Sequence, residues 1–180
     1  QTVSLTGNEG TYSGGGIHSE SSSLTMADGT INNNTGYAYG SGIYAAGSTV
    51  DVSNTVVDAN GYTVGGGGLY LYGTTASLNH MTISNNRSRD EGGGIAHYQN
   101  TVRLDDVTLS GNSVDGTSWQ GGGAIWSENG ILLVSNSTLN NNWSALQGGG
   151  IDFEASTAIL TNTTLSANQS ITGGGVYLRP

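Results

Sequence analysis

The chain has 180 residues, enough for one domain of ordinary size, and it contains 31 Gly, one Pro and no Cys. Only 9% of the residues are charged, the four cationic residues are all Arg, and the formal net charge is −9. This balance argues against nucleic acid and anionic membranes as partners, and the lack of Cys excludes a disulfide framework. No run of about 18 apolar residues is present, so we expect no membrane span.

An internal repeat of 26 residues organises the whole chain. Its marker is an Asn that recurs at intervals of 26, 26, 26, 26, 30 and 26 residues. With this Asn as the eighth residue of each coil, residues 1–180 form one domain of seven coils, which begin at Gln1, Ala27, Ser53, Asn79, Asp105, Ser135 and Thr161. The seventh coil stops at Pro180, so we expect it to be incomplete.

Each coil carries three apolar columns, taken here in chain order. Coil position 5 holds Leu5, Ile31, Val57, Ile83, Leu109, Leu139 and Leu165. Position 17 holds Ile17, Ile43, Leu69, Ile95, Ala124, Ile151 and Val176. Position 26 holds Met26, Val52, Leu78, Leu104, Val134 and Leu160. Apolar and polar residues alternate around each column, as in short strands with one face inward. The pattern predicts an all-β right-handed parallel β-helix with three parallel sheets, roughly 33 Å tall at the spacing of paired strands.

The first two strands of each coil are separated by an Asn and then by a Gly cluster. Asn tolerates a left-handed turn, and its amide can bond to the equivalent Asn one coil away. We therefore expect a buried structural ladder of Asn8, Asn34, Asn60, Asn86, Asn112, Asn142 and Asn168. The glycines are expected to supply positive φ where the chain enters the second strand.

The fifth coil is four residues longer than the others. We expect the extra residues to lie in loops, partly before its glycines, around Gly116 to Gln120, and partly after them, around Asn129.

The repeats resemble those of polymorphic outer-membrane proteins, which form surface passengers and have a Phe-x-x-Asn motif followed shortly by Gly-Gly-Ala-Ile. The matching stretches are Leu5 to Asn8 with Gly14 to Ile17, Ile83 to Asn86 with Gly92 to Ile95, and Leu139 to Asn142 with Gly148 to Ile151. This chain has Leu, Ile or Val in place of Phe, and usually Gly in place of Ala. The resemblance covers the whole chain and implies a surface-exposed β-helix with an adhesive or structural role.

Parallel β-helices also occur in polysaccharide lyases and hydrolases, so catalytic groups must be considered. A hydrolase needs two carboxylates on opposite sides of the scissile bond. Candidate pairs are Asp105 with Asp106, Asp90 with Glu91, and Asp152 with Glu154. Adjacent strand residues point to opposite faces, and for the pair Asp152 and Glu154 we expect no charged partner from a neighbouring coil. We interpret all of these residues as solvating charge and predict a protein that is not an enzyme.

No cofactor motif is present, and carboxylates at Asp105, Asp106 and Asp115 are the candidates for binding Ca²⁺. The three histidines, His18, His80 and His97, occupy different coil positions, so we expect no metal site built from them. His97 falls in an inward column between Leu71 and Trp126, which predicts a hydrogen-bonded core imidazole.

Two outward columns are candidates for binding surfaces. The first is a tyrosine surface that could stack on sugar rings or pack on another protein, formed by Tyr44, Tyr70, Tyr72, Tyr98 and Tyr177. The second is a hydroxyl ladder on the first strand, similar to ice-binding solenoids, formed by Ser4, Thr30, Val56, Thr82, Thr108, Thr138 and Thr164. Ordinary cross-strand pairing explains the tyrosines as well, and the hydroxyl column also fits the strand propensity of Thr.

The sequence shows no capping helix or charged edge at either end of the solenoid. From this we expect head-to-tail self-association of open coil ends. The resulting hypothesis is a non-catalytic extracellular or cell-surface protein, part of a fibre or adhesin. The alternatives are a glycan-binding module that uses the tyrosines, an ice-binding surface and a polysaccharide-active enzyme.

Overall fold

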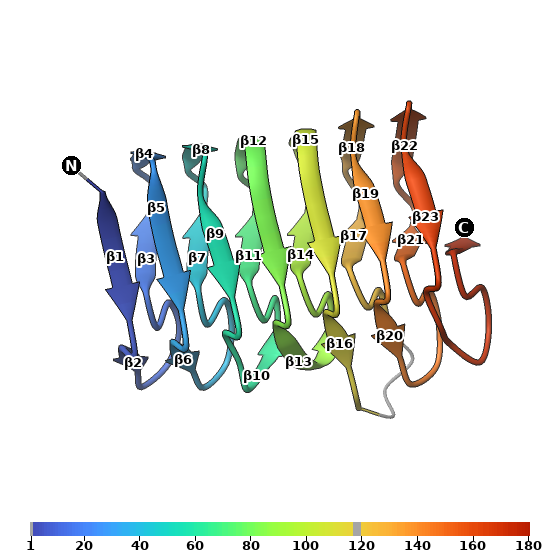
Figure 1. The fold of residues 1–180 in the computed structure, drawn as a ribbon, viewed down its shortest axis with the longest axis horizontal. Coiled ribbons are helices and arrows are strands. Elements are labelled where there is room, and N and C mark those ends of the chain that lie inside the picture. Colours follow the sequence, from blue (N-terminus) through green and yellow to red (C-terminus); the bar gives the residue numbers. More distant parts are fainter. Residues whose placement is uncertain (1, 117–119) are drawn as a thin grey trace.

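The computed structural model describes residues 2–116 and 120–180, and these fold into a parallel β-helix of seven coils without a helix among the described residues. The coils follow one another along the long axis in sequence order (Figure 1). Strands of successive coils pair in parallel and, apart from a shift between Thr63 and Gly65, in register, for example Leu69 with Ile43 and with Ile95. The predicted fold class is confirmed.

The predicted three strands per coil form three faces. The first face carries β1 (Val3–Thr6), β5 (Gly29–Asn32), β9 (Val56–Asp58), the second halves of β12 (Thr75–Ser84) and β15 (Thr101–Ser110), β19 (Thr138–Asn140) and β23 (Thr164–Ser166). The second face carries β3 (Ile17–Glu20), β7 (Ile43–Ala46), β11 (Leu69–Tyr72), β14 (Ile95–Tyr98), β17 (Ile125–Glu128), β21 (Ile151–Glu154) and β24 (Val176–Arg179). The third face carries β4 (Ser23–Ala27), β8 (Thr49–Ser53), the first halves of β12 and β15, β18 (Ile131–Ser135) and β22 (Thr157–Thr161).

The hydrogen-bonded sheets do not coincide with these faces. Because β12 and β15 continue around the corner between the third and first faces, both faces belong to one sheet of eleven strands. The second face is a separate sheet of seven strands. Between the first and second faces lies a corner strip of short strands, formed by β2 (Glu9–Gly10), β6 (Thr35–Gly36), β10 (Thr63–Gly65), β13 (Arg87–Glu91), β16 (Ser113–Val114) and β20 (Trp143–Ser144).

Single residues with positive φ turn the chain at its corners. The corner before the first face uses Asp28, Asn54, His80, Asp106, Asn136 and Asn162. The corner after it uses Gly7, Asn33, Ala59, Asn85, Gly111, Asn141 and Ala167. The left-handed residue at this second corner thus precedes each ladder Asn, and the ladder Asn itself is not left-handed. Entry into the second face uses Gly14, Gly40, Gly66, Gly92, Gly122, Gly148 and Gly173, as the Gly clusters predicted.

The seven repeating Asn residues form a continuous hydrogen-bonded ladder inside the corner after the first face. In each of the first six coils, the backbone N–H and the Nδ2 of the Asn donate to Oδ1 of the Asn in the next coil, at 2.9–3.0 Å. From the second coil on, Nδ2 also donates to a first-face backbone carbonyl of the preceding coil, for example Asn86 to Val57 at 2.9 Å. The five inner members are at most 1% exposed. The ladder satisfies buried polar groups at a turn and keeps the coils in register.

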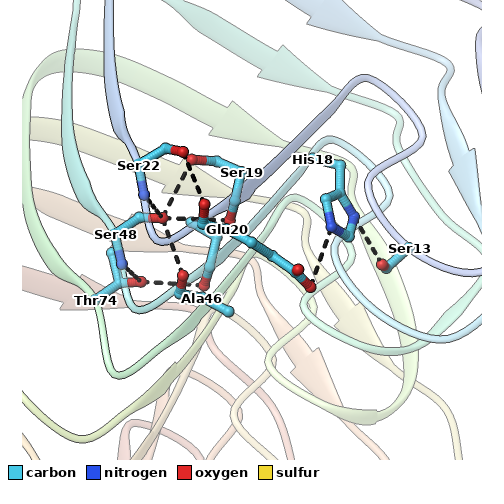
Figure 2. A network of polar contacts seen from close by, with 9 residues as sticks. Ser13, His18, Ser19, Glu20, Ser22, Ala46, Ser48 and Thr74 are labelled. Carbon is cyan, nitrogen blue, oxygen red and sulfur yellow. Dashed lines mark hydrogen bonds and ion pairs between the residues drawn. The ribbon is translucent and has the colours of Figure 1, made fainter.

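Hydroxyl side chains reinforce the corner between the second and third faces. Ser48 donates to the carbonyl of Ala46 at 3.0 Å and accepts the backbone N–H of Ser22 from the preceding coil at 3.3 Å. Its own N–H donates to Thr74 of the following coil at 3.4 Å, and Figure 2 shows this chain of contacts. The corner is therefore held from coil to coil by side chains, like the Asn corner.

The core is a column of aliphatic side chains enclosed by the three faces, with Ile31, Ile43, Leu69, Leu78 and Ile83 fully buried. In the fifth coil the inward residue of the second face is Ile125, which pairs with Ile95 and Ile151. The prediction of Ala124 at this position was wrong by one residue. All four extra residues precede Ile125, and none follows near Asn129, because the spacing from Ile125 to Val134 is the usual nine. Residues 117–119 of the predicted insertion lie outside the described residues.

Candidate functional site

The predicted tyrosine surface lies on the outward side of the second face. Tyr44 on β7 stacks against Tyr70 on β11, with ring centroids 5.7 Å apart. Tyr98 on β14 lies 5.3 Å from Tyr70 and 6.2 Å from Tyr72. Tyr177 on β24 stands apart, because its column passes from Tyr70 through Ala96, Trp126 and Asp152 before reaching it. The structure thus brings four of the five tyrosines together.

The side chains of this tyrosine cluster are less exposed than those of an open binding surface would be. Tyr70 is 9% exposed, Tyr44 and Tyr98 are half-buried, and only Tyr72 is exposed, at 47%. Tyr39, from the loop before the second face, covers Tyr70 with ring centroids 4.5 Å apart. Tyr70, Ala96 and Trp126 form a small second core outside the solenoid interior. The outward tyrosine surface therefore leaves only part of its ring area exposed, because the loop that carries Tyr39 folds back over Tyr70.

A buried carboxyl group borders the tyrosine cluster. Glu91, at the end of β13, is 8% exposed, and burial raises its pKa to about 7. A hydrogen bond with the hydroxyl of Tyr98 opposes this rise, and burial together with Glu91 raises the pKa of Tyr98. Burial, and then Glu91, also raises the pKa of Tyr70. The Glu91 side chain is therefore a packed structural group that can be neutral near pH 7.

A second charged cluster lies further along the same outward column. Asp152 on β21 is fully buried, and Arg179 on β24 donates to its Oδ2 at 3.0 Å. Arg179 also pairs with Glu154 at 3.4 Å and stacks over the ring of Trp126 at 4.8 Å. Burial raises the pKa of Asp152 to about 6, although Arg179 acts in the opposite direction.

The predicted absence of a charged partner for Asp152 and Glu154 was therefore wrong. The register between β21 and β24 places Arg179 beside Glu154. On the other side Glu154 faces Glu128 across the sheet, and burial followed by Glu154 raises the pKa of Glu128. Asp152 and Glu154 therefore share Arg179, and the Asp152 carboxylate is inaccessible to solvent.

The remaining acidic candidates are dispersed. Asp105 accepts hydrogen bonds from Ser135 at 2.7 Å and Asn136 at 2.8 Å, which hold its pKa below the usual range. Asp106 occupies a left-handed corner 3.6 Å from His80, and Asp115 pairs with Arg87. In the two described ranges, no three His, Asp or Glu side chains form a group that could hold a metal ion.

The histidines occupy three unrelated environments. His18 lies between Ser13 at 3.0 Å and Glu20 at 3.2 Å (Figure 2). His97 is fully buried between Ser127 Oγ at 3.1 Å and the carbonyl of Gln99 at 2.7 Å, and burial lowers its pKa. The hydrogen-bonded core imidazole at His97 is thus present. Its neighbours in the column are Leu71 and Ser127, where Trp126 had been predicted, because of the same one-residue shift in the fifth coil.

The outward hydroxyl column of the first face is continuous in the structure, from Thr30 through Val56, Thr82, Thr108 and Thr138. The neighbouring outward column is irregular, because the carboxylate of Asp58 interrupts its hydroxyl groups. Asp58 accepts a hydrogen bond from Ser84 at 2.6 Å. This face therefore presents mixed groups and not a uniform array of free hydroxyls.

Two exposed tyrosines on the corner strip were missed by the sequence reasoning. Tyr37 is 80% exposed and Tyr62 is 57% exposed, and both line two open hollows. They sit one residue apart in the repeat, at coil positions 11 and 10, so a search for identical positions does not pair them. The only sequence signal is a recurring Tyr shortly after the ladder Asn.

Among the residues that the structure describes, no helix is long and apolar enough to cross a membrane.

A family model described as a right handed beta helix region matches residues 15–180. The match identifies the repeat and its handedness and does not single out the polymorphic outer-membrane protein type. No curated protein and no solved structure matches the chain.

Proposed function

Because the chain belongs to the family of right-handed β-helix regions, we propose that it is a non-catalytic extracellular scaffold, a part of a surface fibre or adhesin. The β-helix fold is consistent with a structural or adhesive role. The observation that carries the proposal is the Asn ladder, in which every inner member donates to, and accepts from, its neighbours with no polar atom free. Such a ladder supports a rigid rod that repeats from coil to coil. The proposed surface location is inferred from the resemblance of the sequence to the repeats of surface passengers.

Members of this family include both enzymes and non-enzymes, so the absence of activity is part of the proposal. The burial and the pairing of the candidate carboxylates support the proposed absence of catalytic activity. Asp152 is fully buried and paired with Arg179, and Glu91 is buried against Tyr98. A glycosidase needs two carboxyl groups that reach opposite sides of an accessible bond. Neither buried group meets that requirement.

The proposal includes head-to-tail association with a second copy. In the described chain, β22, β23 and β24 each pair with a strand on one side only. Beside these open edges Leu160 is 38% exposed and Leu178 is 69% exposed. The first coil of another copy, added in parallel, would extend the sheets and cover these side chains.

Two measurements test the proposal on the purified chain. Sedimentation velocity and negative-stain electron microscopy should show rods that lengthen with protein concentration, and Leu178→Asp should shorten them. A strictly monomeric chain at every concentration would overturn the association. Release of new reducing ends or unsaturated products from polysaccharides, abolished by Asp152→Asn or Glu91→Gln, would overturn the non-catalytic role.

A further inference from the structure

Two aromatic rings project from the corner strip into solvent. Tyr37 directly follows β6, and Tyr62 directly precedes β10, so the rings come from the second and third coils. Their exposures of 80% and 57% exceed that of any residue of the tyrosine cluster on the second face. Single exposed apolar side chains are common on protein surfaces, so exposure alone does not make a site. The residues that surround the two rings indicate a binding site here.

The rings share two adjoining hollows. The first, about 310 Å³, is also lined by Glu9, Thr11 and Thr35. The second, about 270 Å³, is also lined by Thr63, Val64 and Arg89. Because both rings line both hollows, we treat them as one groove, the corner groove. It runs along the helix axis from the first coil to the fourth, a span of about 14 Å at the spacing of paired strands.

The ring of Tyr62 is held in place from one side. The guanidinium of Arg87, on the fourth coil, lies 5.0 Å from the ring centroid and is itself paired with Asp115. The cation–π contact comes from the coil that follows Tyr62, whereas Tyr37 belongs to the coil that precedes it. The ring is thus braced on the side away from Tyr37, and a ligand in the groove would not have to order it.

We propose that the corner groove binds a neutral glycan chain, with sugar rings stacked on Tyr37 and Tyr62. The negative face of an aromatic ring suits the C–H face of a sugar ring, and the tyrosine hydroxyl remains free for a hydrogen bond. Sugar hydroxyls meet the exposed hydroxyls of Thr11 and Thr35, and the carboxylate of Glu9 accepts at one end of the groove. Concave shape, aromatic walls and a few polar groups are the usual features of a small-ligand site.

Other ligand classes fit this groove less well. Nucleic acid and acidic glycans require free cations, but Arg89 is held by Asp90 through two bonds of 3.0 Å, Arg87 pairs with Asp115, and the net charge is −9. A stable protein interface buries about 800 Å² per partner around an apolar centre. Of the residues that line the groove, only Val64 is aliphatic. Charge and surface chemistry therefore favour an uncharged, hydroxyl-rich chain.

The test is affinity electrophoresis of the whole chain in native gels that contain mixed-linkage β-glucan, arabinoxylan or galactomannan, with polygalacturonate and oligo(dT) as charged probes. At least one neutral polysaccharide should retard the protein. Tyr37→Ala and Tyr62→Ala should each weaken that binding roughly tenfold, the size of effect expected when an aromatic stacking platform is lost. Tyr37→Phe should retain most of the binding, because the ring remains.

Tyr72→Ala is the matched control, since Tyr72 is an exposed tyrosine on the second face, outside the groove. Circular dichroism should show that all variants are folded, because each removed ring is at the surface. The proposal is overturned if no neutral polysaccharide retards the chain, if Tyr72→Ala and not the groove variants abolishes binding, or if a charged probe binds more tightly. Glycan binding and rod formation are read out separately, so either proposal can fail without the other.

Discussion

The side-chain oxygen of Asn112 accepts two hydrogen bonds from Asn86, one from its backbone N–H and one from its Nδ2, both at 3.0 Å. Asn112 in turn donates from its own Nδ2 to the carbonyl of Ile83 at 2.9 Å and to Oδ1 of Asn142 at 3.0 Å. Every donor and acceptor of this amide is used, inside a corner where the residue is fully buried. Stability of the coil stack should therefore depend on single ladder members.

Replacing Asn112 by Ala should destabilise the protein strongly. The change leaves two donors of Asn86 and the carbonyl of Ile83 without partners in a site closed to water. Each unsatisfied buried group costs about 1–3 kcal/mol, so we expect a loss of about 3 kcal/mol or more in the free energy of unfolding. Urea denaturation followed by fluorescence measures it. The control is Asn32→Ala on the outward side of β5, whose amide oxygen accepts from the hydroxyl of Thr6 at the surface, and we expect a loss below about 1 kcal/mol there.

The glycines after the ladder should differ sharply in their tolerance of a methyl group. A Cβ on Gly68 would lie 2.6 Å from the carbonyl oxygen of Gly94 and 3.2 Å from the Asn86 amide. Both neighbours are held by the coil stack, so Gly68→Ala should cost several kcal/mol, about as much as severe overpacking of a core. Gly73 in the same coil has φ +56° but no atom closer than 3.9 Å. Gly73→Ala should cost only about 1–2 kcal/mol of backbone strain. Equal midpoints in urea for the two variants would contradict this explanation.

Most of the fold could be predicted from the sequence because the 26-residue repeat reflects how each coil packs on the next. Ile31, Val57 and Ile83 face inward since each coil must bury the same position against the next. The error in the fifth coil arose where the spacing changes. An alignment on the Gly cluster alone cannot tell whether Ala124 or Ile125 enters the strand, and the larger side chain fills the inward position next to Ile95.

The candidate sites were harder to predict, because they depend on how loops cover the outward columns. Strand alternation predicts that Tyr70 points outward, and it does, but Tyr39 from a corner loop buries it. The contact of Arg179 with Asp152 depends on the register of one strand pair. The exposure of Tyr37 and Tyr62 depends on the path of the corner strip, which has no regular alternation to follow.

The stability of the protein should fall as pH rises through the titration range of Glu91. Burial raises the folded-state pKa of this carboxyl to about 7 from an ordinary value of 4.5. Between these values the folded state retains a proton that the unfolded state has lost, so the free energy of unfolding decreases with rising pH and levels off above about 7. The full effect is on the order of 3 kcal/mol.

Urea denaturation of the wild type and of Glu91→Gln at pH 5 and pH 8 measures the contribution of Glu91. The variant cannot ionise, so its loss of stability between the two pH values should be smaller than that of the wild type. Its hydrogen bond with Tyr98 can still form, because an amide oxygen accepts from the hydroxyl as a carboxyl oxygen does. An equal pH dependence in the two proteins would show that Glu91 is not the responsible group.

Removing Arg179 should destabilise the protein more at pH 8 than at pH 5. Asp152 is fully buried, and Arg179 is the residue that pairs with its charge. Because the folded-state pKa of Asp152 is already raised to about 6, the group is largely neutral at pH 5 and ionised at pH 8. Arg179→Met should therefore cost about 3–5 kcal/mol at pH 8, the usual cost of a buried charge that loses its partner, and less at pH 5.

A double-mutant cycle separates this ion pair from the packing of Arg179 on Trp126. Arg179→Met loses both interactions and the pairing with Glu154, whereas in Asp152→Asn the stacking on Trp126 remains. The double variant should be more stable at pH 8 than Arg179→Met alone, because no unpaired charge is left in the buried site. The stacking loss is common to both Met variants and does not depend on pH, so a cost of Arg179→Met that is the same at pH 5 and pH 8 would assign its role to packing and not to charge.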